Sequence, residues 1–179
     1  YRLGRKQTLV QAIYSIETLS KVDVICIDKT GTLTEGKMAV SEVVYIEGAK
    51  VVDEALGNYL AHTLDTDSTT KALKAHFNSL EDHDLLDKLS FSSSRKWGAM
   101  EFAGLGKIYV GAPDFLMPGV VIPAAVSLEQ DLGARILLVA QTNDNFDDFT
   151  QYNQLNPLAY IIIEDGVRSD ASSTLDFRS

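Results

Sequence analysis

Hydrophobic residues recur every three or four positions over residues 7–19, from Leu9 to Leu19. This spacing predicts an amphipathic helix. The apolar run that follows, over residues 22–27, predicts a buried strand. A helix packed beside such a strand is typical of one half of an α/β unit.

The pattern changes after residue 37. Apolar and polar residues first alternate loosely, which is typical of a strand with one buried face. Acidic and hydroxyl residues then stand where helices could begin. The expected elements of this part are a strand over 38–46, a turn over 47–50, a helix from Asp53 to about Thr63, and a helix from Asp67 or Ser68 to about Leu80.

A series of strand-like segments fills the rest of the chain, and tight turns join them. Such a series predicts an antiparallel sheet with helices packed on it, and so a mixed α/β (α+β) fold. Gly104-Leu105-Gly106 lies between two of the segments and predicts a hairpin turn. Residues 142–157 have no apolar period and are expected to form an exposed acidic loop. The expected strands cover 87–92, 96–102, 107–111, 135–141 and 158–163, and the expected helices 113–117 and 122–132.

Composition narrows the class of protein. The chain has 179 residues, of which 45% are hydrophobic and 23% charged, an ordinary globular mixture. The formal net charge of −9 argues against nucleic acid or an anionic membrane surface as a partner. No apolar run approaches the roughly 20 residues that span a bilayer, so we expect this chain to be soluble and not membrane-inserted.

Cysteine and histidine give no metal-binding motif. Cys26 lies in the first predicted strand and is expected to be a small buried hydrophobic residue. His62, His76 and His83 have no second ligand at helical spacing. We therefore expect packed or solvated histidines and no metal site among them.

The segment from Asp28 to Thr34, DKTGTLT, carries the strongest chemical signal. A carboxylate at the tip of a buried strand, followed by a glycine-bearing turn with hydroxyl groups, can present an oxygen nucleophile to a phosphoryl group. Aspartate as a phosphoryl acceptor is a known form of covalent catalysis. The alternative is a strand that ends in an ordinary turn, and the full string favours the nucleophile.

This segment resembles the phosphorylation motif of P-type (E1-E2) cation-transporting ATPases, which belong to the haloacid-dehalogenase-like phosphotransferases. The resemblance implies that Asp28 accepts the γ-phosphoryl group of ATP, with Lys29 and Thr30 as its phosphate neighbours. It also implies that Asp28 and the backbone carbonyl of Thr30 bind Mg²⁺, together with residues outside this chain.

Further segments resemble the same family and follow in its order. FSSSRK at Phe91 resembles the family's F-S-x-x-R-K string, GAPD at Gly111 its K-G-A-P-E segment, and GARILLVA at Gly133 its G-x-R-V-L-x-x-A strand. An exposed aromatic ring can stack on a base, and a nearby cation can reach the base or the phosphates. Taken alone, a residue such as Phe91 is more often part of the core, and a pair such as Arg95-Lys96 is more often solvated. The nucleotide-binding residues that the resemblance implies are Phe91, Arg95, Lys96, Gly111 and Arg135.

The resemblance also implies a domain organisation. DGVR at Asp165 resembles the family's D-P-x-R hinge, so Asp165 and Arg168 are expected at a hinge. The chain is then a segment of the cytoplasmic part of a membrane protein, whose partners are ATP and the remaining phosphorylation, actuator and transmembrane domains of the same polypeptide. The expected division is 1–36 for the first piece of the phosphorylation (P) domain, 37–164 for the nucleotide-binding (N) domain, and 165–179 for the hinge and the returning P-domain segment.

Two positions depart from the family pattern. Val110 stands where the family has a lysine before G-A-P, and Gly166 replaces the hinge proline. Val110 could line the nucleotide pocket, where a lysine would strengthen binding. Alternatively it could face inward from a strand, where a lysine would destabilise the fold.

The expected function is nucleotide binding by this chain and ATP-driven cation transport by the whole protein. The family's later lysine and G-D-G-x-N-D segment do not occur in the chain, so we expect the isolated chain not to turn over ATP. Two alternatives remain. A haloacid-dehalogenase-like phosphatase is disfavoured, because Thr30 stands where its second acid would be. A non-catalytic nucleotide-sensing module is the other.

Overall fold

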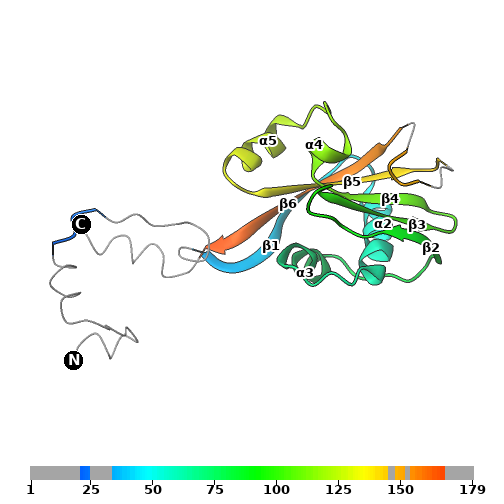
Figure 1. The fold of residues 1–179 in the computed structure, drawn as a ribbon, viewed down its shortest axis with the longest axis horizontal. Coiled ribbons are helices and arrows are strands. Elements are labelled where there is room, and N and C mark those ends of the chain that lie inside the picture. The colour runs from blue at the N-terminus through cyan, green and yellow to red at the C-terminus, as the bar shows by residue number, and fades with distance from the viewer. Residues whose placement is uncertain (1–20, 25–33, 145–147, 152–153, 168–179) are drawn as a thin grey trace, which may run out of the picture.

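The computed structural model describes residues 21–24, 34–144, 148–151 and 154–167, and a six-stranded sheet lies at its centre (Figure 1). The strand order is β1-β6-β5-β4-β3-β2, and every neighbouring pair is antiparallel, which confirms the predicted sheet. The strands are β1 (Thr34–Tyr45), β2 (Leu85–Leu89), β3 (Trp97–Phe102), β4 (Gly106–Gly111), β5 (Arg135–Thr142) and β6 (Asn156–Val167), and the helices are α2 (Ala49–His62), α3 (Ser68–His76), α4 (Pro113–Leu116) and α5 (Ala124–Asp131).

Helices cover both faces of the sheet, α2 and α3 on one and α4 and α5 on the other (Figure 1). Strand β5 shows the consequence, because its side chains alternate between two cores. Leu137 and Val139 pack with α2 and α3, whereas Ile136 and Leu138 pack with Leu116 of α4. A strand that is buried on both faces has apolar side chains at nearly every position, which explains the continuous apolar sequence of this segment.

The two longest strands, β1 and β6, form a ribbon that extends beyond the rest of the sheet (Figure 1). Their pairing continues to Thr34 and Val167, and the Thr34 hydroxyl donates a hydrogen bond to Asp165 Oδ2 at 2.5 Å. The predicted domain boundaries at 36/37 and 164/165 therefore fall within these two strands. The ribbon is the route by which the chain reaches residues 28–33.

Helix boundaries differ from the prediction in two places. Helix α2 begins at Ala49 instead of Asp53, because Gly48 occupies the N-cap position without a side-chain hydrogen bond and Val52 is buried in the first turn. Helix α3 begins as predicted, after Asp67, whose carboxylate accepts hydrogen bonds from the first turn. It ends at His76, since the next residue, Phe77, becomes extended and packs into the core.

The predicted exposed loop over residues 142–157 is only partly exposed. Phe149 and Leu155 are buried in the core beneath α4 and α5, although no apolar period marks them. The hydroxyl of Tyr109 donates to the carbonyl of Phe149 at 3.0 Å, and the two rings pack edge to face. Two isolated buried residues create no hydrophobic periodicity, so the sequence pattern does not reveal them.

The predicted strand over residues 22–27 is wrong in the part that the structure describes. Val22 and Val24 are exposed, at 37% and 72%, and no described strand pairs with residues 22–24. Without a partner strand, an extended segment there leaves its backbone groups to solvent. Cys26 and the predicted helix over 7–19 lie outside the described residues. Among the helices that the structure describes, none is long and apolar enough to cross a membrane.

Candidate nucleotide-binding site

The strand register brings several predicted residues to one end of the sheet. At this end β2 leads into the connection that carries Phe91 and Lys96, and β4 ends at Gly111. Strand β5 begins there with Arg135, whose partner is Ile163 of β6. The ribbon of β1 and β6 projects from the same end. Segments far apart in the sequence thus meet beside the chain that leads to Asp28.

A recess opens beside Phe91, whose side chain is 48% exposed. Its volume is about 50 Å³, smaller than the roughly 300 Å³ or more typical of small-molecule pockets. A base could therefore enter only in part and would otherwise rest against the exposed phenylalanine ring. The residues that line the recess are Tyr59, His62, Thr63, Leu64, Asp65, Lys88, Ser90, Phe91 and Met100.

Lys96 and Gly111 lie side by side, although 15 positions separate them in the sequence. The amide of Ala112 donates to the carbonyl of Lys96 at 3.0 Å, and the Lys96 amide donates to Ser92 at 2.6 Å. Lys96 has a φ of 63°, an uncommon backbone conformation for a residue with a side chain. A Cβ at Gly111 would lie 2.2 Å from Trp97 Cβ. Gly111 therefore permits the close approach of β3 and β4 at the site end.

Arg95 packs within the connection between β2 and β3. Its guanidinium lies 4.8 Å from the centre of the Trp97 ring, and it donates hydrogen bonds to the carbonyls of Ser90 and Trp97. These contacts hold the two ends of the connection together. The geometry gives Arg95 a structural role next to the recess.

Arg135 lies on the face of the sheet that α2 and α3 cover. Its guanidinium donates a hydrogen bond to the hydroxyl of Thr69 in the first turn of α3. The N-cap of this helix, Asp67, accepts hydrogen bonds from Thr69 and Thr70. Partial burial alone would raise the pKa of Asp67, but these hydrogen bonds outweigh it and hold the pKa below its usual value. A capped helix thus fixes the hydroxyl that orients Arg135.

Val110 is a core residue. It is only 6% exposed and packs in the core beneath α2 and α3, with neighbours that include Met100 and Leu137. The interpretation of Val110 as a pocket residue is therefore wrong, and the inward-facing alternative is confirmed. Sequence alone left both open because the residue lies next to Gly111, at the end of β4 where the predicted nucleotide-binding residues lie.

Tyr59, Met100, Lys88 and Asp65 line the recess and were not predicted from the sequence. Burial raises the pKa of the Tyr59 hydroxyl, and the carboxylate of Asp65 raises it further, while Arg95 lowers it. Tyr59 is therefore a neutral phenol at physiological pH. Their positions in the sequence were the available signal: Lys88 comes three residues before Phe91, and Asp65 comes two residues after the expected end of a helix at Thr63.

The three histidines each have separate neighbours. His62 Nδ1 is 3.0 Å from the carbonyl of Asn58, and the His76 ring packs on Phe77. His83 bridges Glu54 of α2 and the carbonyl of Ala103, at 2.8 and 2.9 Å. Within the described part of the chain, no group of three histidine, cysteine or acidic side chains could hold a metal ion.

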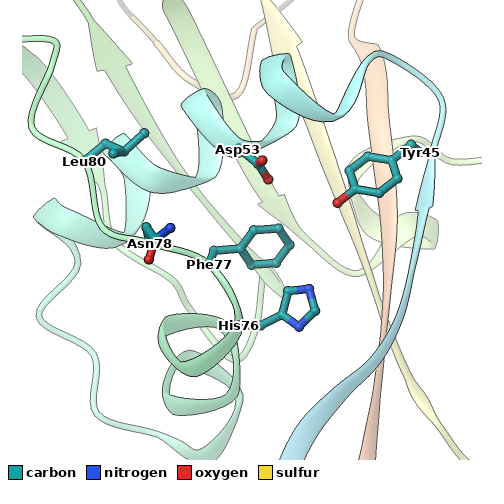
Figure 2. Close-up of a pocket in the computed structure, with 6 residues that line it drawn as sticks. All are labelled: Tyr45, Asp53, His76, Phe77, Asn78 and Leu80. Carbon is teal, nitrogen blue, oxygen red and sulfur yellow. The ribbon is translucent and has the colours of Figure 1, made fainter.

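A larger hollow, of about 260 Å³, lies near the other end of α2 (Figure 2). Tyr45, His76 and the buried ring of Phe77 surround it, together with Asp53. Asp53 and Tyr59 are six residues apart on α2, which is about 9 Å along a helix. None of the predicted nucleotide-binding residues lines this hollow, so the recess at Phe91 remains the candidate site.

Of the other predicted residues, the structure describes only Asp165, near the end of the ribbon. Asp165 is partly buried and accepts the hydrogen bond from Thr34. Asp28, Lys29, Thr30 and Arg168 lie outside the described residues. Their roles in catalysis, Mg²⁺ binding and the hinge remain predictions.

Comparison with known proteins defines the class. A scan against protein-family models found no match. The probable cation-transporting ATPase exp7 of Streptococcus pneumoniae is 39% identical over 98% of this chain, and the calcium-transporting ATPase CtpE of Mycobacterium bovis is 36% identical over the same share. The chain spans about a quarter of each relative's length, 23% in both cases.

Solved structures share the fold. The catalytic domain of the CPx-ATPase CopB-B, solved in connection with its conformational changes upon nucleotide binding, matches 98% of this chain with a TM-score of 0.61 and covers 58% of that protein. At 17% identity, this match shows the fold alone. In sequence the chain matches a segment of cation-transporting ATPases, and in fold it matches the catalytic domain of a CPx-ATPase. Together the two comparisons support a segment from the nucleotide-binding and phosphorylation part of a P-type cation-transporting ATPase.

Proposed function

We propose that this chain binds ATP, and that the whole protein couples ATP hydrolysis to cation transport through a phosphoryl group carried by Asp28. One observation supports the binding step most directly. Phe91 and Lys96, from the connection between β2 and β3, lie at the same end of the sheet as Arg135, the first residue of β5. The names of the relatives, a cation-transporting and a calcium-transporting ATPase, support the transport step.

The described residues fit a nucleotide. Phe91 offers an exposed ring for a base, and Met100 gives the recess an apolar wall. Lys88 lines the recess, Lys96 is exposed in the connection that carries Phe91, and Arg135 lies at the start of β5. These cations would attract the phosphates locally, against a chain with a net charge of −9.

Mg²⁺ would be held near Asp28 and Thr30, with further ligands from the rest of the protein. When bound, it would neutralise negative charge on the transferring phosphoryl group. The Asp28 carboxylate would act as the nucleophile. The ribbon of β1 and β6 would connect it to the nucleotide-binding domain on the cytoplasmic face of the membrane.

Titration of the ¹⁵N-labelled chain with ATP tests the binding step. We expect amide signals of Phe91, Lys96 and Gly111 to shift with ATP. Phe91→Ala should weaken binding by about 1–3 kcal/mol, the usual effect of losing a stacked aromatic ring. Phe115→Ala is the matched control, because Phe115 is also exposed, at 51%, but lies on α4. Equal effects of the two substitutions would contradict the proposed site.

Phosphorylation tests the catalytic step. In the full-length protein, Asp28→Asn should abolish the acid-stable phosphoprotein formed from radiolabelled ATP and abolish transport, while ATP binding persists. Calcium is the first ion to assay, given the name of one relative. We expect the isolated chain to bind ATP without turnover. Full-length protein that binds ATP but forms no phosphoprotein would favour a nucleotide-sensing module instead.

A further inference from the structure

The hydroxyl group of Tyr59 has an unusual position in the recess. The side chain projects from α2 into the core that α2 and α3 form with the sheet, and it is buried, at 7% exposure. Among the described residues, no group forms a hydrogen bond with its hydroxyl oxygen. In the described part of the chain, Asp165 Oδ1 is the one fully buried side-chain oxygen or nitrogen without a hydrogen-bond partner. Because the Tyr59 hydroxyl oxygen also has no partner, it is not fully buried and keeps some contact with solvent. The hydroxyl therefore reaches the recess.

A glycine in β3 creates the space for this arrangement. A Cβ at Gly98 would lie 2.7 Å from Tyr59 Oη and 3.0 Å from the backbone nitrogen of Phe91. The tyrosine hydroxyl and the start of the proposed stacking residue thus meet over the same backbone position. An added side chain would displace one or the other.

Two neighbouring polar groups already have partners. His62 Nδ1 lies 3.0 Å from the carbonyl of Asn58, and the Thr63 hydroxyl is 3.4 Å from Asp65 Oδ2. Met100 makes another part of the wall apolar. A base that enters the recess exchanges water for these surfaces, and its polar edge loses hydrogen bonds unless a protein group replaces them.

We propose that Tyr59 recognises the base, by a hydrogen bond between its hydroxyl group and the polar edge of a purine that stacks on Phe91. This inference rests on the proposed function and adds a specificity-determining residue to it. The phenol stays neutral and can donate to a ring nitrogen or accept from an amino group. A heterocycle of the same shape without polar edge atoms gains nothing from Tyr59.

Binding measurements with two ligands test this inference. ATP is compared with benzimidazole riboside triphosphate, which keeps the bicyclic shape and the phosphates but lacks the amino group and the nitrogens of the six-membered ring. We expect Tyr59→Phe to weaken ATP binding about 3- to 10-fold, the effect of losing one neutral hydrogen bond, and to leave binding of the analogue unchanged. Tyr45→Phe is the matched control, because Tyr45 lines the other hollow (Figure 2).

The outcomes separate this inference from the proposed function. If the wild-type chain shows no saturable binding of ATP, both are overturned. If Phe91→Ala weakens ATP binding and Tyr59→Phe does not, this inference alone fails. Equal losses for ATP and the analogue would also overturn it, since they indicate a structural change in the recess. The wild-type chain with ¹³Cζ-labelled tyrosine gives an independent measure: the Tyr59 signal should move with ATP and not with the analogue.

Discussion

Two buried tyrosines lie on opposite faces of the sheet and are held differently. Tyr109 packs beneath α4 and α5, and its hydroxyl donates to the carbonyl of Phe149 at 3.0 Å. Tyr59 projects from α2 into the core that α2 and α3 form with the sheet, and its hydroxyl faces the recess without a partner among the described residues. The two side chains are buried to nearly the same extent, so burial does not distinguish a structural tyrosine from one available to a ligand. The distinguishing feature is whether the hydroxyl group already has a hydrogen-bond partner within the protein.

The same difference extends to the charged residues of the two faces. Lys107 is 2% exposed, and its ammonium group donates to the carbonyl of Asp144 at 2.9 Å, which ties the segment after β5 to β4. At the site end, Lys88 and Lys96 are exposed. The face with α4 and α5 is closed by internal hydrogen bonds, whereas the site end keeps polar groups open to solvent.

The largest effect should come from placing a charge in the core beside the recess. Val110→Lys would bury an ammonium group without a partner, and we expect the free energy of unfolding to fall by about 3–5 kcal/mol. Val121→Lys is the matched control, because Val121 is 90% exposed. Urea denaturation measures both. If Val110→Lys instead strengthened ATP binding at unchanged stability, the assignment of Val110 to the core and not to the nucleotide site would be wrong.

Exchanging the two tyrosines for phenylalanine sharpens the comparison directly. Tyr109→Phe leaves the buried carbonyl of Phe149 without its donor, so we expect a loss of about 1–3 kcal/mol in stability and no change in ATP affinity. Tyr59→Phe should show the reverse pattern, with stability nearly unchanged. Thermal unfolding gives the stability of each variant, and ATP titration gives its affinity for ATP. A similar loss of stability in both would remove the distinction between the faces.

Most strands could be predicted from the sequence because they depend on local pattern. The run over 135–141 and the hairpin at Gly104 are examples, and both are found. The family resemblance placed Phe91, Lys96 and Gly111 in one functional group, and the register of β2, β3 and β4 brings them to the same end.

Other features depend on packing between distant segments, which no local pattern encodes. Tyr59 belongs to an apolar helix stripe and becomes notable only because Gly98, 39 positions later, leaves space for its hydroxyl. The start of α2 was placed four residues late, because its N-cap, Gly48, offers no side-chain acceptor. Phe149 lies in a polar stretch, and its ring is buried against Tyr109, 40 positions earlier in the chain.

A smaller effect is expected at the helix that orients Arg135. Asp67→Ala removes the N-cap of α3, which typically costs about 1 kcal/mol. Because the pKa of Asp67 lies below its usual value, its stabilising effect is present above the unfolded pKa and is lost as pH falls through the folded pKa. Denaturant unfolding at neutral and acidic pH should therefore show a difference between wild type and variant that shrinks in acid. Ser68→Ala, next to the cap, is the control, and an equal loss there would argue against the capping role.

The smallest effect concerns His83, which ties α2 to the turn between β3 and β4. Its hydrogen bond to the carboxylate of Glu54 raises the pKa of the imidazole, and the bond to the Ala103 carbonyl raises it further. The protonated ring donates to both acceptors, so its stabilising effect is full below the unfolded pKa of about 6.5 and is lost as pH rises through the folded pKa. We expect His83→Gln to lower stability at about pH 5.5 more than at about pH 8.5, as measured by denaturant unfolding. Tyr109→Phe serves as the reference, because its neutral hydrogen bond should cost the same at both pH values. A pH-independent loss in His83→Gln would show that the imidazole acts by packing alone.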